Sequence, residues 1–338
     1  MRKSIGLWLI VVAVIAGGIW TVLYRGHSLA GSTPQRLSQV TIAQAANTLL
    51  YLPLYVALDE GYLQKNGIDA QIITSGGDSQ AFAALASGQV QFAQGDPTFV
   101  AISHSRGGPG IVIASVLDRV AFWGVTFDKN ISPFTNPQQF RGMNVVTYPD
   151  PNTAYVVQKD LDQRASLVLG KDTAITQAAF GTELGPIQNG TAQIAVSIEP
   201  TVANAVQQGA HIVFSYANAW GPFALTGLMT TETYASQNPD VVQGMVDAYE
   251  EALQYIRQNP QGAVAVGERN FPEVNKTVIV QAINRLVSEN VFPQHAVMSQ
   301  QSWDAALQLR EQIGDLPPGN YDSLNDQAYG LAAMQTAK

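Results

Sequence analysis

Short apolar runs alternate with amphipathic segments along most of the chain. The apolar runs are rich in Val, Ile and Ala and predict strands, and the segments between them have the spacing of helices. The predicted strands are 40–46, 68–74, 90–93, 111–117, 121–127, 143–148, 174–180, 193–197 and 211–215. Strands that alternate with helices predict an α/β fold with mostly parallel sheets.

Helix-period segments and capping residues place the predicted helices between these strands. They are 53–60, 80–87, 97–105, 136–142, 153–163, 183–189, 200–208, 239–258, a helix that begins at Pro260, 275–288 and 300–313. Asp78 or Ser79 is expected to cap the helix 80–87. The helices after residue 239 are expected to pack around the first of two lobes.

One segment of the chain occurs twice. Residues 88–101 read GQVQFAQGDPTFVA and residues 190–203 read GTAQIAVSIEPTVA. In each copy the first glycine is expected to end a helix in the left-handed conformation, and the apolar run forms a strand. The acid, Asp96 or Glu199, then caps the next helix ahead of a proline. Strands and Asn-Thr pairs upstream recur at nearly the same offset, which predicts two similar α/β lobes.

Two crossings between the lobes are predicted, at 121–127 and 219–229. Lobe I then comprises 35–122 and 224–338, lobe II comprises 123–223, and the crossings form a hinge. Residues 1–34 are predicted to be a signal peptide or a membrane anchor with a tether, because Arg2 and Lys3 precede a long uncharged apolar run. Either interpretation places the rest of the chain outside the cytoplasm.

Composition narrows the possible functions. The net charge of −8 lacks the basic footprint of a nucleic-acid-binding protein. The absence of cysteine excludes disulfides, thiolate metal sites and a cysteine nucleophile. No G-x-S-x-G, G-K-[ST] phosphate loop or H-E-x-x-H motif is present, and the four histidines are scattered. We therefore predict no catalytic residue, no metal ligand and no cofactor.

The loops that follow the predicted strands carry the candidate chemistry, because ligands of open α/β sheets bind beyond the carboxyl ends of strands. Asp96 and Glu199 either face a ligand from the two lobes or cap helices with their oxygens occupied by backbone N–H groups, and capping is the favoured interpretation. Asn47 either bonds the ligand or only caps. Few basic residues fall in these loops, which favours an uncharged or cationic heterocycle over an anion.

Aromatic residues also lie at strand ends and crossings, where flat rings can bury a flat ligand. These residues are Tyr51, Trp123, Tyr148 and Trp220. The alternative for the two tryptophans is that they pack the hinge.

Several segments resemble one protein family. Residues 52–72 (LPLYVALDEGYLQKNGIDAQI) are similar to the A-x-x-x-G-[YF]-[LF]-x-x-x-G-[IL]-[DE] pattern of ABC-transporter solute-binding proteins. Residues 84–97, 140–146 and 189–200 resemble further segments of the group that takes up nitrate, alkanesulfonates, taurine and thiamine-pyrimidine precursors. The resemblance covers roughly residues 40–290.

The resemblance implies a two-lobe periplasmic-binding-protein fold of type II and a monomer that delivers a small solute to an ABC permease. The implied ligand is a small pyrimidine-like heterocycle or a sulfonate- or nitrate-type solute. Its implied contacts are Asn47, Tyr51, Gly77, Asp78, Ser79, Asp96, Tyr148, Thr153 and Glu199, to which the aromatic pattern adds Trp123 and Trp220. The family's lipid-anchor cysteine is missing.

Two alternatives remain open at this point. One is an enzyme of pyrimidine-precursor synthesis on the same fold, although the cysteines and histidines of the eukaryotic enzymes are missing. The other is a membrane-tethered sensor domain.

Overall fold

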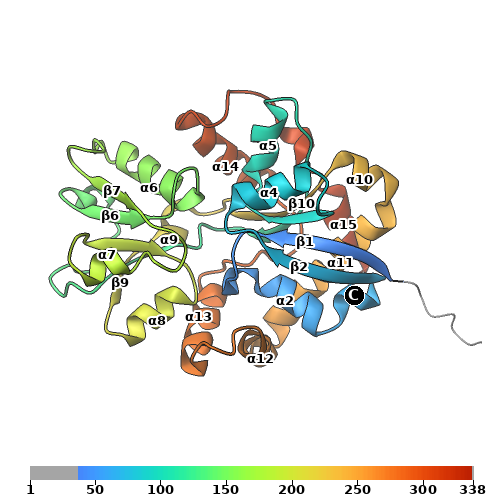
Figure 1. The fold of residues 1–338 in the computed structure, drawn as a ribbon, viewed down its shortest axis with the longest axis horizontal. Coiled ribbons are helices and arrows are strands. Elements are labelled where there is room, and N and C mark those ends of the chain that lie inside the picture. Colours follow the sequence, from blue (N-terminus) through green and yellow to red (C-terminus); the bar gives the residue numbers. More distant parts are fainter. Residues whose placement is uncertain (1–36, 337–338) are drawn as a thin grey trace, which may run out of the picture. The chain divides into compact units, whose positions relative to one another are not determined.

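The strands of the described residues form two five-stranded sheets, which we call the sheets of lobe I and lobe II (Figure 1). The computed structural model describes residues 37–336, so the predicted leader 1–34 lies outside the described residues. The sheet of lobe I has the order β2 (Ile68–Thr74), β1 (Ser38–Gln44), β3 (Phe92–Gly95), β10 (Thr226–Thr230), β4 (Ile111–Leu117). The sheet of lobe II has the order β7 (Ala174–Gln177), β6 (Asn144–Thr147), β8 (Ile194–Ser197), β5 (Trp123–Thr126), β9 (His211–Ser215).

Each sheet contains one strand that is antiparallel to its neighbours, and in both cases it is the first strand after a crossing. β5 pairs antiparallel with β8 and β9, and β10 pairs antiparallel with β3 and β4. The pairs β1–β2, β1–β3, β6–β7 and β6–β8 are parallel. The chain therefore builds most of lobe I, crosses to build lobe II, and returns to insert β10, which confirms the predicted two-lobe α/β architecture.

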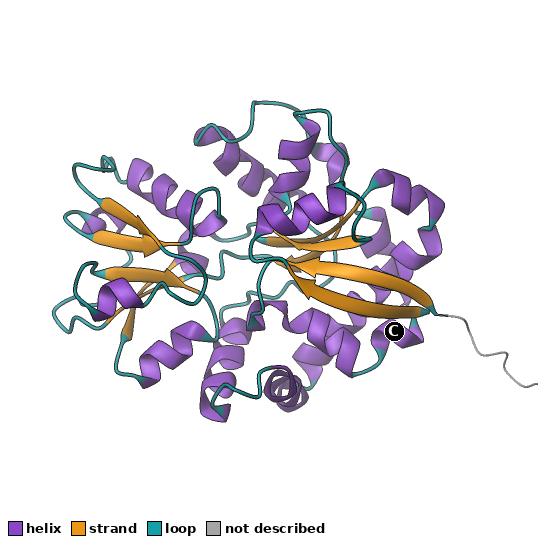
Figure 2. Cartoon of the chain, in the orientation of Figure 1, coloured by secondary structure: helices purple, strands orange, loops and turns teal. Residues whose placement is uncertain are grey.

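Helices cover both sheets (Figure 2). In lobe I they are η1 (Leu49–Tyr51), α2 (Leu52–Asp59), α3 (Tyr62–Lys65), α4 (Asp78–Ala86), α5 (Thr98–His104), α10 (Glu232–Gln237), α11 (Pro239–Gln258), α12 (Pro260–Asn270), η3 (Asp322–Leu324) and α15 (Ala328–Thr336). In lobe II they are η2 (Pro137–Phe140), α6 (Thr153–Arg164), α7 (Gly185–Gln188), α8 (Thr201–Gln207) and α9 (Tyr216–Trp220).

Two C-terminal helices contact both lobes, whereas the sequence predicted that they wrap only lobe I. Helix α13 (Lys276–Ser288) packs on η1 and on α8, and α14 (Gln300–Gln312) packs on α5 and on α6. The side chain of Asn275 caps the N-terminus of α13, and the side chain of Ser299 caps the N-terminus of α14. Each of these two helices therefore packs against helices of both lobes.

The duplicated segment has the local geometry that its sequence predicts. Gly88 and Gly190 both have φ of +77°, the left-handed conformation that ends a helical turn with least strain in glycine. Each is followed by a short, fully buried strand, β3 or β8, that lies in the middle of its sheet. The two copies thus place Asp96 and Glu199 at equivalent sheet edges.

Two local features differ from the prediction. Helix α4 begins at Asp78 itself, after Gly77, and no side chain caps it, because Asp78 bonds elsewhere. The short helix predicted at 136–142 is present as the 3-10 helix η2. Helix α9, which Ser215 caps, was not expected in the return crossing.

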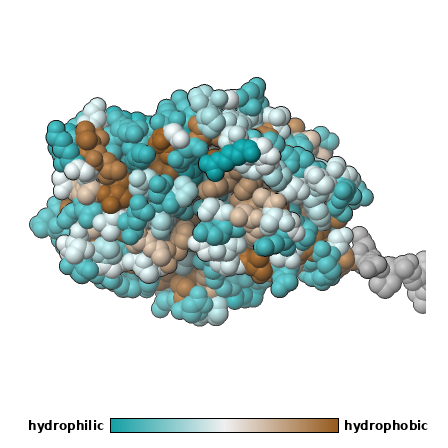
Figure 3. Space-filling view, turned by 45° about the horizontal axis from the view of Figure 1, so that its top comes forward, coloured by the Kyte–Doolittle hydropathy of each residue, from teal (hydrophilic) through white to brown (hydrophobic). Residues whose placement is uncertain are grey.

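The core lies between each sheet and its helices. β4 is buried along its whole length, and α11 buries one apolar stripe that includes Val242, Tyr249 and Ile256. The face drawn in Figure 3 is mostly hydrophilic, with hydrophobic residues in separate patches. Within residues 37–336, no helix has the length and apolar character needed to cross a membrane.

Candidate functional site

Three hollows lie between the lobes and share lining residues, so we treat them as one cleft. A small chamber of about 40 Å³ adjoins a hollow of about 320 Å³ through Asp78, Asn152 and Phe180. It adjoins a third hollow of about 270 Å³ through Thr48, Phe180 and Ile198. Phe180 therefore lines all three, and residues of both lobes line each of them.

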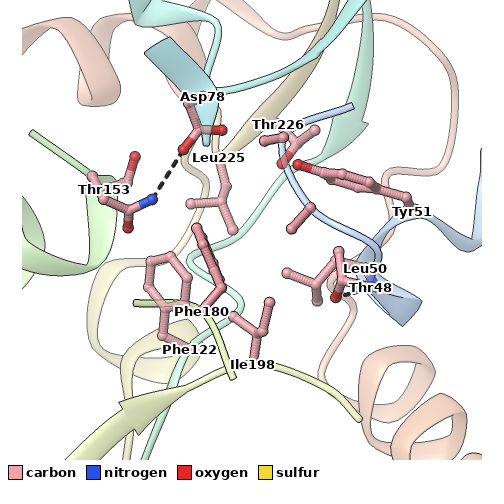
Figure 4. A pocket seen from close by; sticks show the side chains of 13 residues that line it. Thr48, Leu50, Tyr51, Asp78, Phe122, Thr153, Phe180, Ile198, Leu225 and Thr226 are labelled. Carbon is pink, nitrogen blue, oxygen red and sulfur yellow. Dashed lines mark hydrogen bonds between the residues drawn. The ribbon is translucent and has the colours of Figure 1, made fainter. Parts of the chain in front are cut away.

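The small chamber is mostly apolar with a few polar groups (Figure 4). Its side walls include Leu50, Tyr51, Phe122, Phe180, Ile198 and Leu225, and its polar members are Thr48, Asp78, Asn152, Thr153 and Thr226. Such a lining is typical of small-molecule sites, where apolar walls bury the ligand and a few polar groups orient it.

Side-chain hydrogen bonds between loops at the strand ends connect the lobes across the cleft. Asn152 Nδ2 donates to Asp78 Oδ2 at 3.0 Å, drawn as the dashed line in Figure 4. Thr153 Oγ1 donates to Asp96 Oδ2, and Thr48 Oγ1 donates to the backbone oxygen of Glu199 at 2.7 Å. The lobes are therefore in contact at the carboxyl ends of their strands.

Asp96 uses one carboxylate oxygen as in a helix cap and the other in an ion pair. Its Oδ1 accepts from the backbone N–H of Thr98 at 2.8 Å, as in a helix cap. Its Oδ2 lies 2.7 Å from Nη2 of Arg310, a fully buried arginine of α14. Nη1 of Arg310 also donates to the Pro151 backbone oxygen at 2.9 Å, which ties this ion pair to lobe II. Asp96 itself does not line the three hollows.

Glu199 has the equivalent arrangement in the second copy. Its Oε2 accepts from the backbone N–H of Ala203 at 3.0 Å, and its Oε1 forms an ion pair with Arg285 of α13. Glu199 is fully buried and lines the third hollow. Both duplicated acids thus use one oxygen for the following helix and the other for an arginine from the C-terminal helices.

Asp78 lines the cleft and, unlike Glu199, has no arginine or lysine partner among the described ion pairs. Its Oδ1 accepts from the backbone N–H of Asp96 at 3.0 Å, and its Oδ2 accepts from Asn152. Burial, followed by the nearby charge of Asp96, raises the pKa of Asp78 from 3.8 to about 6. A donor from a ligand would meet a carboxylate that is already poorly solvated.

The remaining predicted residues of the two lobes lie around the cleft. Tyr51 is buried and lines the small chamber, and Gly77 and Ser79 line the second hollow. Asn47 and Tyr148 line the third hollow, where Asn47 Oδ1 accepts from Tyr55.

The two tryptophans pack at the crossings and line none of the three hollows. Trp123 is fully buried, and its Nε1 donates to Glu289 at 3.0 Å. Trp220 stacks on Tyr216 with the ring centres 6.3 Å apart. This placement matches the alternative in which they pack the hinge.

Sequence reasoning missed four residues that shape the cleft: Phe180, Glu183, Arg285 and Arg310. Phe180 is the last residue of a predicted strand and Glu183 begins the predicted helix after it, so the rule that ligands bind at strand ends was the available signal. Arg310 lies on the buried face of α14 beside Trp303 and Leu307, so an arginine in an apolar stripe was also a signal. None of these positions belongs to the motifs that carry the family resemblance.

Comparison with known proteins places the chain in a family. Residues 50–263 match the model of the NMT1/THI5-like family, so the chain belongs to that family. YtlA of Bacillus subtilis (strain 168) is 21% identical over 293 residues, which cover 84% of this chain and 86% of YtlA.

Solved structures share the fold at low identity. The periplasmic nitrate-binding protein NrtA from Synechocystis PCC 6803 has a TM-score of 0.71 at 14% identity, over 89% of each chain. The desulfurization enzyme DSZB has a TM-score of 0.66 at 13% identity, over 89% of this chain and 100% of that chain. The chain therefore has the two-lobe periplasmic-binding-protein fold, which is found in a binding protein and in an enzyme.

Proposed function

We propose that this protein is an extracytoplasmic solute-binding protein that captures a small molecule in the cleft and delivers it to an ABC importer. The observation that carries the proposal is that both lobes line one partly apolar cleft and form hydrogen bonds across it. A ligand held by both lobes stabilises their closed arrangement, because it binds that arrangement more tightly than an open one. Membership of the NMT1/THI5-like family supports a role of this kind.

The proposed moving bodies are lobe I, residues 35–122 and 224–338, and lobe II, residues 123–223. The two connecting segments support a hinge because they lie side by side: the backbone N–H of Phe223 donates to the Asp118 oxygen at 3.0 Å. The N–H of Tyr216 likewise donates to the Phe122 oxygen at 3.1 Å. Paired segments of this kind can bend together while each sheet stays intact.

The first experiment identifies the ligand. Native mass spectrometry of the protein purified from its own organism will show a co-purified solute as a mass difference. At 100 times its dissociation constant that solute will add about 2.7 kcal/mol to the free energy of unfolding and raise the Tm. Small-angle scattering should then show a smaller radius of gyration with the solute than without it. A solute that binds with no change in Tm or radius would contradict capture by closure.

We propose binding rather than catalysis, and one observation that supports this is that the two duplicated carboxylates, Asp96 and Glu199, are each held in an ion pair. An acid or base needs a titratable group that is free to exchange a proton with the substrate. The co-purified solute should therefore be recovered with unchanged mass after incubation with the protein. A new product mass that disappears in Asp96→Asn or Glu199→Gln would favour the enzyme alternative.

The importer partner can be tested separately. Genes for a permease and an ATPase beside the gene for this chain are expected, and a neighbouring kinase or cyclase gene would favour a sensor. The purified protein should stimulate ATP hydrolysis by that importer in vesicles only when its solute is present.

A further inference from the structure

Glu183 lines the third hollow and has one buried oxygen without a hydrogen-bond partner among the described residues. The residue is 1% exposed and follows β7, close to the start of α7. Its Oε1 accepts from Tyr148 Oη at 3.0 Å and from Ser197 Oγ at 2.6 Å. Its Oε2 is buried and has no hydrogen-bond partner within the described residues.

The position of Glu183 is set by two neighbouring strands. Tyr148 directly follows β6 and Ser197 ends β8, so both donors come from the carboxyl edge of the lobe II sheet. Two hydroxyls that donate to the same oxygen fix the orientation of the carboxyl group. The carboxylate is therefore held in place by one oxygen while the other remains to accept.

The charges of the cleft have one sign. The charged side chains that line the three hollows are Asp78, Asp150, Glu183 and Glu199, and no lysine, arginine or histidine lines them. Arg285 forms an ion pair with Glu199 and does not itself line the hollows. An anionic solute would meet acids, and a cationic solute or a strong N–H donor would meet acceptors.

We propose that Glu183 Oε2 is the acceptor of a ligand subsite that takes a cationic nitrogen group, such as an amidinium or ammonium, carried on a ring that packs against Phe180. Phe180 stacks on Tyr148 with the ring centres 4.0 Å apart and lines the same hollow. This proposal rests on the proposed function, since it names the class of solute that the cleft selects. It predicts that the solute is a cationic nitrogen compound rather than nitrate or a sulfonate.

A pair of probes with the same ring and opposite charge tests the proposal. Benzamidinium and benzenesulfonate each carry one phenyl ring, and isothermal titration calorimetry at one pH and salt concentration compares them. We expect benzamidinium to bind at least tenfold more tightly than benzenesulfonate. In Glu183→Gln, which keeps the shape and removes the charge, benzamidinium should bind at least tenfold more weakly.

Glu273→Gln is the matched control, because Glu273 is exposed on a turn of lobe I outside the three hollows. It should bind benzamidinium like the wild type. Circular dichroism and the Tm of each variant without probe will show whether Glu183→Gln is folded. If Glu183→Gln does not fold, Ser197→Ala removes one of the donors that position the carboxylate and should weaken benzamidinium binding at least threefold.

The failures can be told apart. Preference for benzenesulfonate, equal binding of both probes, binding of neither, or unchanged affinity in the folded Glu183→Gln variant overturns the proposal. The last result would mean that water alone satisfies Oε2. In all these cases the proposed function stands if any other solute stabilises the protein, and it fails if none does.

Discussion

Replacement of Arg310 by methionine is expected to be the most destabilising single change at the cleft. The Arg310 side chain is 1% exposed and its partner Asp96 is 3% exposed, so neither charge has water to replace the other. The substitution also removes donors to Thr98 Oγ1 at 3.1 Å and to Asp315 at 2.9 Å. Breaking a buried pair from one side costs about 3–5 kcal/mol, because the remaining charge is left uncompensated.

The cost of leaving the Asp96 charge uncompensated can be separated from the cost of lost packing around Arg310. Asp96→Asn combined with Arg310→Met removes both charges and keeps the oxygen that accepts from Thr98, so the double variant should be more stable than Arg310→Met alone. Arg269→Met is the matched control: its guanidinium is half exposed and pairs with Asp59 and Glu60, so about 1 kcal/mol or less is expected.

Urea unfolding followed by circular dichroism at pH 7 measures these free energies. For a chain of this size, about 2 °C of Tm accompanies each kcal/mol, so Arg310→Met should lower the Tm by about 6–10 °C. The reasoning is refuted if Arg310→Met loses no more stability than Arg269→Met. It is also refuted if the effects of Asp96→Asn and Arg310→Met simply add in the double variant.

Three further outcomes are expected. Because the raised pKa of Asp78 means that the folded state binds its proton more tightly, the free energy of unfolding should fall as pH rises from about 4 to about 6. Asp78→Asn should remove up to about 3 kcal/mol of that fall in the free energy of unfolding. Urea titrations at pH 4.5 and 7.5 measure the difference. If the variant shows the same dependence on pH as the wild type, Asp78 is not the group responsible. Gly244→Ala places a Cβ 2.6 Å from the Asn66 backbone oxygen, so it should lower the Tm although alanine favours helices; a raised Tm would show that α11 can shift. Phe180→Ala should weaken binding of the co-purified solute at least about tenfold in calorimetry, since Phe180 lines all three hollows; unchanged affinity would place the solute elsewhere.

The architecture could be predicted from the sequence because it depends on local patterns. The strands 68–74 and 111–117 matched their predicted bounds because turn residues flank both segments, and the second is also a continuous, fully buried apolar run. The duplicated segment likewise placed Asp96 and Glu199 at equivalent edges of the two sheets, because the same local pattern of glycine, strand and acid occurs in both copies. These features are visible within about twenty residues of chain.

The rest of the site depends on contacts between distant residues. Arg310 lies 214 residues from Asp96, and periodicity shows that Arg310 is on a buried face without showing what that face meets. Glu183 was read as the start of a helix, and its role depends on hydroxyls of two other strands. The sequence predicts Asp78 or Ser79 as a cap and the family resemblance implies Asp78 as a ligand contact, but neither shows that Asp78 accepts hydrogen bonds from groups of both lobes.

The insertion of β10 between β3 and β4 has a consequence for how the protein is made. While the ribosome synthesises the chain, β4 emerges with no neighbour in its own sheet, and the position between β3 and β4 stays empty until residues 226–230 follow. Strands β5 to β9, by contrast, are all available before residue 216. The second sheet can therefore assemble on the nascent chain before the first sheet is complete, and the apolar strand β4 remains unpaired in the meantime.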